Sequence, residues 1–271
     1  LPNGTAKGGG QANAGFAAML SEADAGLVTG EREAREAEVT SDFRLRVGLD
    51  VTMLNELFPG AALNTSIWTS PVTTSTISVS GNFLTLNNGS SLASGAVARV
   101  QSYRSFPCYT TYPTYATFQL QFSATPVVNN IHEWGLGIAT GVAAPTDGAF
   151  FRINATAQLQ AVMSVAGSET TVTIADFATL IGVNTTRQFL VTVGADHVDY
   201  WIDNIKVASI DTPAAAAMST GSAMLPVLLR SYNSALVTGT ACLMKVGTVN
   251  ITLGEMHANK AWSHVMAGAG G

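Results

Sequence analysis

The sequence predicts an all-β protein, a two-sheet antiparallel sandwich with an N-terminal, partly helical arm. Three observations support this fold class. From residue 47 onward, apolar and polar residues alternate with a period of two, as in half-buried strands. Turn residues separate these runs at hairpin-like spacing. The charged residues, only 11% of the 271, are unevenly placed, because 13 of the 31 lie within residues 1–50.

The N-terminal arm, residues 1–46, differs in composition from the rest of the chain. It begins with a Gly-rich stretch and an Ala-rich stretch, and then Glu and Arg alternate with Ala over residues 31–38, after Thr29. This pattern favours a solvated helix. The arm has too few large apolar residues to bury a face within one subunit. We therefore expect it to be an anchor that lies on another protein or on copies of itself.

The body, residues 47–255, contains about a dozen short strands. The clearest single strand is 115–122, in which aromatic and aliphatic residues alternate with Thr and Gln. Ser80-Gly81-Asn82 joins two runs into one hairpin, and Asp203-Asn204 joins two more. Other alternating runs lie at 134–138, 149–153, 159–165, 189–193 and 242–253. Residues 256–271 form a C-terminal Gly/Ala-rich tail.

Composition excludes several classes of function. The net charge is −5 and no basic block is present, so we expect no nucleic-acid partner. No run of 18 apolar residues exists, so we expect no membrane insertion. Cys108 and Cys242 are 134 residues apart and are expected to be buried small hydrophobes rather than a bridge. The exposed faces are Thr, Ser, Gln and Asn rather than Lys and Glu, which favours a subunit packed among neighbours in a homo-oligomer.

Two segments carry a family resemblance. Residues 57–69, LFPGAALNTSIWT, and the hairpin 198–209 resemble strands of the concanavalin A-like lectin/glucanase family, including its laminin-G-like members. Asn204 stands where that family usually has Gly, and Asn tolerates the positive φ of such a turn. The resemblance implies that the body is a jelly-roll domain.

A second resemblance concerns residues 43–50, 133–140 and 147–152, which look like segments of tailed-bacteriophage virion structural proteins. It implies a non-enzymatic virion structural protein on the exterior of the phage particle, either a capsid decoration or a head-fibre protein anchored by its N-terminal arm. The expected partners are further copies of the chain, as a trimer, and the major capsid protein or other virion proteins.

The residues that would carry enzyme chemistry are largely missing. Glucanases of the resembling family place carboxylates on one strand in a Glu-x-Asp-x-x-Glu pattern. Glu133 has a suitable strand position, but Gly135 stands where the pattern places its second carboxylate, and Gly137 follows on the same face of the strand. We therefore predict no enzyme activity, with Glu133 a structural carboxylate paired with Arg152 or His132.

Neither the histidines nor the acidic residues indicate a metal site. The four histidines lack metal-ligand spacing, so no cofactor or metal is expected. Asp196, Asp199 and Asp203 form the densest acidic group, and we interpret it as the solvated face of a hairpin rather than a calcium site.

The alternative function is a carbohydrate-binding, lectin-like module of a tail or tail fibre, with host-surface glycans as partners. Aromatic rings that stack on sugars would carry such binding. In a β-sandwich, however, aromatic residues more often belong to the core. The candidate contacts for carbohydrate or a partner are Tyr109, Tyr112, Tyr115, Trp134 and Trp201.

Overall fold

A computed structural model describes residues 51–88, 93–110, 112–213, 223–239 and 242–254. The predicted arm, residues 1–46, and the predicted tail, residues 256–271, lie outside the described residues. The described part of the chain is nearly all β, with a single helical turn, α2 (Phe177–Leu180). The predicted fold class is confirmed, because two antiparallel sheets pack face to face as in a jelly-roll sandwich.

The first sheet, called the β7 sheet below, has the order β14-β13-β12-β7-β16-β5-β4, and β1 also pairs with β16. All its strand pairs are antiparallel. Its strands are β1 (Val51–Glu56), β4 (Thr76–Ser80), β5 (Phe83–Asn87), β7 (Thr114–Phe122), β12 (Arg187–Val193), β13 (His197–Ile202), β14 (Ile205–Asp211) and β16 (Met244–Leu253).

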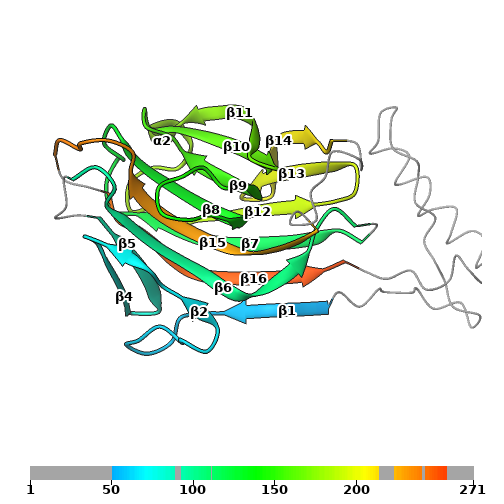
Figure 1. The fold of residues 1–271 in the computed structure, drawn as a ribbon, viewed down its shortest axis with the longest axis horizontal. Coiled ribbons are helices and arrows are strands. Elements are labelled where there is room, and N and C mark those ends of the chain that lie inside the picture. Colours follow the sequence, from blue (N-terminus) through cyan, green and yellow to red (C-terminus); the bar gives the residue numbers. More distant parts are fainter. Residues whose placement is uncertain (1–50, 89–92, 111, 214–222, 240–241, 255–271) are drawn as a thin grey trace, which may run out of the picture. The chain divides into compact units, whose positions relative to one another are not determined.

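The second sheet, called the β8 sheet, has the order β11-β10-β9-β8-β15-β6-β2, and β3 also pairs with β6. Its pairs are antiparallel as well. The edge strands β11 and β14 lie on the same side of the sandwich (Figure 1). The strands are β2 (Trp68–Thr69), β3 (Val72–Thr73), β6 (Val97–Pro107), β8 (Asn130–Ile138), β9 (Asp147–Ile153), β10 (Gln158–Val165), β11 (Ser168–Asp176) and β15 (Met224–Asn233).

The core lies between the sheets and is filled by alternate residues of each strand. Its aromatic centre is Trp134, which stacks on Phe151 with ring centroids 5.7 Å apart and meets Phe189 edge to face at 4.9 Å. These rings come from β8, β9 and β12, so they join the two sheets. Burial of such large apolar surfaces is the main stabilising contribution to the fold.

Both predicted hairpins are confirmed. Gly81 and Asn82 link β4 to β5 with φ of 59° and 62°, and Asp203 and Asn204 link β13 to β14 with φ of 47° and 67°. Two successive residues with positive φ give a turn whose twist matches that of the flanking strands. Asn is among the few non-Gly residues that adopt this conformation at low cost.

The prediction for the two cysteines can be compared with the structure. Cys108 and Cys242 are buried, free thiols, as expected. Burial raises the pKa of each thiol to about 12. No helix in the described ranges is long and apolar enough to cross a membrane.

Candidate functional site

The outer face of the β8 sheet, turned away from the core, carries a polar row that crosses six strands. Residues directly opposite each other on paired strands point to the same face of a sheet. The register places one polar residue per strand on this line, where most sheet residues nearby are apolar. From β11 to β6 the row consists of Thr173, Gln160, Arg152, Glu133, Arg230 and Arg99.

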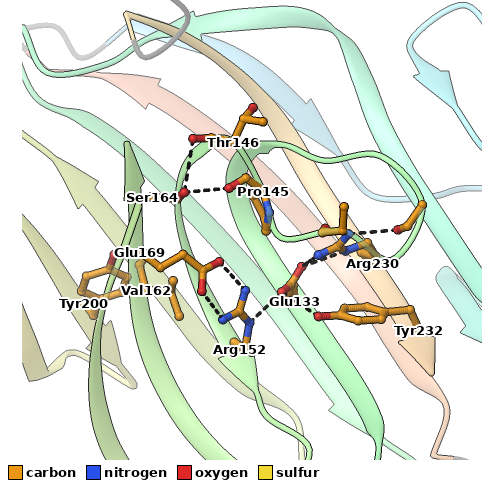
Figure 2. Close-up of polar contacts among 12 residues, drawn as sticks. Glu133, Pro145, Thr146, Arg152, Val162, Ser164, Glu169, Tyr200, Arg230 and Tyr232 are labelled. Atoms are coloured by element: carbon orange, nitrogen blue, oxygen red, sulfur yellow. Dashed lines mark hydrogen bonds and ion pairs between the residues drawn. The ribbon is translucent and has the colours of Figure 1, made fainter. Parts of the chain in front are cut away.

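The centre of this row is a connected set of ion pairs (Figure 2). The Nε of Arg152 donates to Oε1 of Glu133 at 2.7 Å, and its two terminal nitrogens each donate to an oxygen of Glu169 at 2.7 Å. The Nε of Arg230 donates to Oε2 of Glu133 at 2.8 Å. With Arg99, these residues are called the Arg–Glu cluster below. Each carboxylate is thus held by guanidinium groups, and Glu133 is shared by two of them.

The cluster is largely withdrawn from solvent. The side chains of Glu133 and Arg230 are 0% exposed, whereas those of Arg152 and Glu169 are 12% and 21% exposed. Burial acts to lower the pKa of Arg152, but its hydrogen bonds and charge interactions with Glu169 and Glu133 outweigh burial and raise that pKa. Arg230 also lies over the ring of Tyr232, with the guanidinium carbon 4.3 Å from the ring centroid. Such a desolvated charge network persists only because its members are mutually satisfied.

The loop of residues 139–146, between β8 and β9, is bound to the same face. Arg230 donates from Nη1 to the carbonyls of Gly141 and Ala143 at 2.9 and 2.7 Å, and Arg99 donates to the carbonyl of Ala139. The cluster therefore connects the sheet to this loop.

Ser164 adds a further bond to the end of this loop, from its Oγ to the carbonyl of Pro145 at 2.6 Å (Figure 2). Three apolar residues face the same way in the next register line: Phe150, Val162 and Leu228. All three are fully buried although they point away from the core. The part of the outer face around Phe150, Val162 and Leu228 is therefore closed to solvent.

The predicted ion pair of Glu133 with Arg152 is present. His132, the other predicted partner, points to the core, where its Nε2 lies 3.0 Å from Oδ1 of Asn130. At Gly135, an added Cβ would lie 2.5 Å from the carbonyl oxygen of Ala149 and from backbone of the neighbouring strand. Position 135 therefore has no space for the carboxylate that the glucanase pattern requires there.

The outer face of the β7 sheet has different chemistry. Along one register line, Trp201 is followed by Leu190, Thr117 and Asn250. Tyr115 lies on the neighbouring line and shares this face, two strands away from Trp201 and offset by two residues. With ordinary strand spacing, the two Cα atoms are about 12 Å apart. We call this surface the aromatic–amide face; its residues are Tyr115, Thr117, Gln119, Gln188, Leu190, Thr192, Trp201, Asn250 and Thr252.

Asp199 borders this face and is itself bound. Its Oδ1 accepts from Lys206 Nζ and from Ser209 Oγ, both at 2.6 Å, and His197 Nε2 lies 3.4 Å from Oδ2. Burial acts to raise the pKa of Asp199, but the hydrogen bonds from Lys206 and Ser209 outweigh it and lower that pKa.

The acidic residues of this hairpin do not converge on one point. Asp203 pairs with Arg187 at 2.8 Å on the surface, and Asp196 is exposed. The predicted solvated face is confirmed for Asp196 and Asp203, whereas Asp199 is buried. In the described ranges, no three His, Cys, Asp or Glu side chains lie together as metal ligands would.

Of the five predicted contact residues, Tyr115 and Trp201 are partly exposed on one face, and the other three lie elsewhere. Trp134 must be corrected, because its side chain is fully buried among core rings and cannot contact a glycan. Tyr109 packs against the core, and its hydroxyl is buried without a hydrogen-bond partner in the described part of the chain. Burial raises the pKa of Tyr109. Tyr112 is partly exposed in the segment before β7.

No family model and no curated protein sequence matches the chain. Solved structures do match. An endo-β-1,3-glucanase from Pyrococcus furiosus has a TM-score of 0.56 at 9% identity, covering 77% of this chain and 97% of that one. A structure from work on endo-acting O-glycanases of the human gut microbiota has a TM-score of 0.55 at 11% identity, covering 76% and 100%. SCLam, a non-specific endo-β-1,3(4)-glucanase of family GH16, has a TM-score of 0.55 at 9% identity, covering 79% and 92%.

These likenesses show that the chain has the concanavalin A-like jelly-roll fold. They contradict the function expected from the sequence, a non-enzymatic virion structural protein that decorates a capsid or forms a head fibre, because the matching proteins are carbohydrate-degrading enzymes. They also contradict the expectation that the chain is not an enzyme. The comparisons do not show the virion context of the second resemblance; of its segments, residues 133–140 and 147–152 lie in β8, β9 and the adjacent loop of the jelly roll. Residues 43–50 lie outside the described ranges.

Proposed function

We propose that the jelly-roll domain binds a carbohydrate chain on the aromatic–amide face of the β7 sheet. The observation that carries this proposal is that Tyr115 and Trp201 lie on one outer face, separated by about 12 Å of uncharged surface. The fold match to glycan-cleaving enzymes is consistent with a carbohydrate ligand.

The chemistry of the face suits a sugar. An aromatic ring presents an apolar surface to the C–H groups of a pyranose, and two rings set apart can contact two sugar units of one chain. Between them lie the Thr117 and Thr192 hydroxyls, and the Asn250 amide lies one strand further on, beside Thr117. All three groups can both donate and accept hydrogen bonds, as sugar hydroxyls do. The residues between the two rings, Leu190, Thr117 and Thr192, carry no charge, and the ion pair of Lys206 with Asp199 borders this surface beside Trp201.

Calorimetric titration of the full chain with neutral β-1,3-glucan and galactan oligosaccharides tests this proposal. We expect at least one series to bind, and we expect Trp201→Ala and Tyr115→Ala each to weaken binding about tenfold or more, because a stacked aromatic is typically a dominant contact. The control is Tyr103→Ala, which removes a tyrosine that is 65% exposed on the other sheet. Equal affinities for all four proteins, or no binding by the unaltered chain, would contradict the proposal.

A second candidate function is glycan cleavage on the β8 sheet. It is favoured by Glu133 and Glu169, two carboxylates on one sheet face that are joined through Arg152. Glycoside hydrolysis commonly uses two carboxylates, one as proton donor and one as nucleophile or base. In this structure Arg152 binds both, so cleavage requires its guanidinium to release at least one of them.

Release of reducing ends from the same oligosaccharides measures cleavage. We expect Glu169→Gln to abolish any activity that depends on this pair, since Glu169 is the more exposed of the two and its loss leaves the buried pair of Glu133 with Arg230 in place. Activity that survives Glu169→Gln would place the chemistry elsewhere. A matched control is Asp203→Asn, which removes a surface carboxylate of the other sheet.

A further inference from the structure

Arg99 and Arg230 lie directly opposite each other on the paired strands β6 and β15. Like charges in this position repel each other, which makes such pairs destabilising in an antiparallel sheet. Arg230 is fully buried, and Arg99 is partly exposed at the end of the polar row. The arrangement therefore needs compensation from groups of opposite charge or polarity.

The compensation within the described residues is incomplete. Arg230 forms an ion pair with Glu133, but Glu133 also pairs with Arg152. The other carboxylate partner of Arg152 is Glu169. No carboxylate in the described ranges forms an ion pair with Arg99. Three guanidinium groups thus share two carboxylates, and the Arg–Glu cluster has a formal charge of +1.

Backbone carbonyls offset only part of this surplus. Arg99 donates to the carbonyl of Ala139, and Arg230 donates to two further carbonyls of the same loop. Carbonyl dipoles stabilise a cation without neutralising it. Burial and the charge of Arg230 lower the pKa of Arg99, in keeping with an uncompensated positive charge at this point.

We propose that Arg99 anchors a binding site for an oxyanion, the carboxylate or sulfate ester group of an acidic glycan, on the outer face of the β8 sheet. A planar guanidinium can hold such a group through two parallel hydrogen bonds. Gln101, two residues along β6 on the same face and also partly exposed, supplies an amide beside it. Its Nε2 donates one N–H to the carbonyl of Gly137 at 3.4 Å and has a second N–H for an anion. The anion site stands on the charges of the cluster alone, whereas its assignment to a glycan rests on the proposed carbohydrate ligand, whose aromatic–amide face lies on the other sheet.

The test is calorimetric titration of the full chain at low ionic strength, where charge interactions are least screened. The probes are an oligogalacturonate, a sulfated galactan oligosaccharide, a neutral galactan oligosaccharide of equal length, and sodium sulfate. We expect both acidic oligosaccharides to bind about tenfold or more tightly than the neutral one, because hydrogen bonds between charged groups are stronger than neutral ones. Preference for only one acidic probe would identify which of the two oxyanion groups the site accepts.

Three variants assign the site. Arg99→Gln should lose the preference for acidic probes, and Arg99→Lys should keep part of it because the charge remains and the planar fork is lost. Arg104→Gln is the matched control, since it removes an exposed arginine of the same strand that donates to a carbonyl outside the cluster. Near-ultraviolet circular dichroism of each variant in chloride buffer checks that the fold is intact.

The outcomes separate this inference from the proposed function. An acidic preference that Arg99→Gln retains, or that Arg104→Gln removes equally, would overturn the anion site. No preference in the unaltered chain, with neutral glycans still bound in a Trp201-dependent way, would overturn the anion site alone. Arg99-dependent binding of sulfate without any oligosaccharide binding would support the anion site and contradict the carbohydrate proposal.

Discussion

Glu133 and Arg230 form an ion pair in which neither side chain has any exposure to solvent, with 2.8 Å between the arginine Nε and Oε2 of the glutamate. The two residues are 97 positions apart and lie opposite each other on β8 and β15. Buried ion pairs are weak evidence for net stabilisation, because desolvation of both charges opposes their attraction. Loss of one partner is a different matter, since it leaves the other charge buried and unpaired.

We therefore predict that Glu133→Gln lowers the free energy of unfolding by about 3–5 kcal/mol, the usual cost of breaking a buried pair from one side. Both Arg152 and Arg230 lose a charged partner in this variant. Urea denaturation followed by tryptophan fluorescence measures the change.

The matched control for this prediction is Glu169→Gln, which removes a carboxylate of the same cluster that is 21% exposed. Because solvent can reach this end of the cluster, we expect a cost of about 1 kcal/mol or less. If both variants lose the same free energy, burial of the Glu133 pair is not the determining feature.

Stability should also depend on pH through His132. Burial lowers the pKa of His132 from its ordinary value of 6.5 to about 3 in the folded protein. Between these values the unfolded chain binds a proton that the folded chain does not, so the free energy of unfolding falls as the pH falls. The expected slope from this residue is about 1.4 kcal/mol per pH unit below pH 6.

Urea denaturation at pH 6.5, 5.5 and 4.5 tests this dependence. His132→Gln keeps an amide near Asn130 and should lose the contribution of His132 to the slope, whereas His197→Gln, at a side chain that is 51% exposed, should retain it. Identical slopes for the unaltered chain and His132→Gln would show that His132 does not titrate on unfolding.

The local features of the fold could be predicted from the sequence because their causes are local. Alternation over 115–122 predicts β7, and Ser80-Gly81-Asn82 and Asp203-Asn204 predict turns, since each depends on neighbouring residues alone. When both faces of a strand are buried, however, alternation cannot show which side chains reach the solvent. Nearly all of β8 is buried on both faces, and for this reason Trp134 could not be distinguished from a surface aromatic.

The candidate site was harder to predict because its members come from strands far apart in the chain. Glu133 and Arg152 belong to one hairpin, and their pairing was predicted. Arg230 and Arg99 join the row only through the pairing of β15 with β8 and β6, which is set by packing of the whole sheet. The only signal in the sequence was the presence of isolated charges inside otherwise apolar strands, since a buried charge needs a partner.

Gly135 allows a direct test of the space on the β8 sheet. A Cβ there would lie 2.5 Å from the carbonyl oxygen of Ala149 and from Cα of Phe150, and its φ is +155°. Backbone atoms cannot move aside as a flexible side chain can. We predict that Gly135→Ala lowers the free energy of unfolding by about 3 kcal/mol or more, from overpacking and backbone strain together.

Gly137→Ala is the comparison for this variant, because an added Cβ there would meet the carbonyl oxygen of Asp147 only at 3.2 Å and no positive φ is involved. A cost near 1 kcal/mol is expected for it from urea denaturation. Should Gly135→Ala be as stable as the unaltered chain, β8 and β9 must be able to separate locally, and position 135 could then accept a carboxylate.

The final prediction concerns the two thiols. Cys108 and Cys242 are buried, and burial raises the pKa of each to about 12, so almost no thiolate is present at pH 8. Because the thiolate is the reactive form, a chromogenic disulfide reagent should label neither cysteine in the folded protein and both after unfolding. Labelling measured across a urea series should follow the unfolding transition seen by fluorescence. Rapid labelling of one cysteine below that transition would show that its end of the sandwich opens locally, and Cys108→Ser and Cys242→Ser would identify which one.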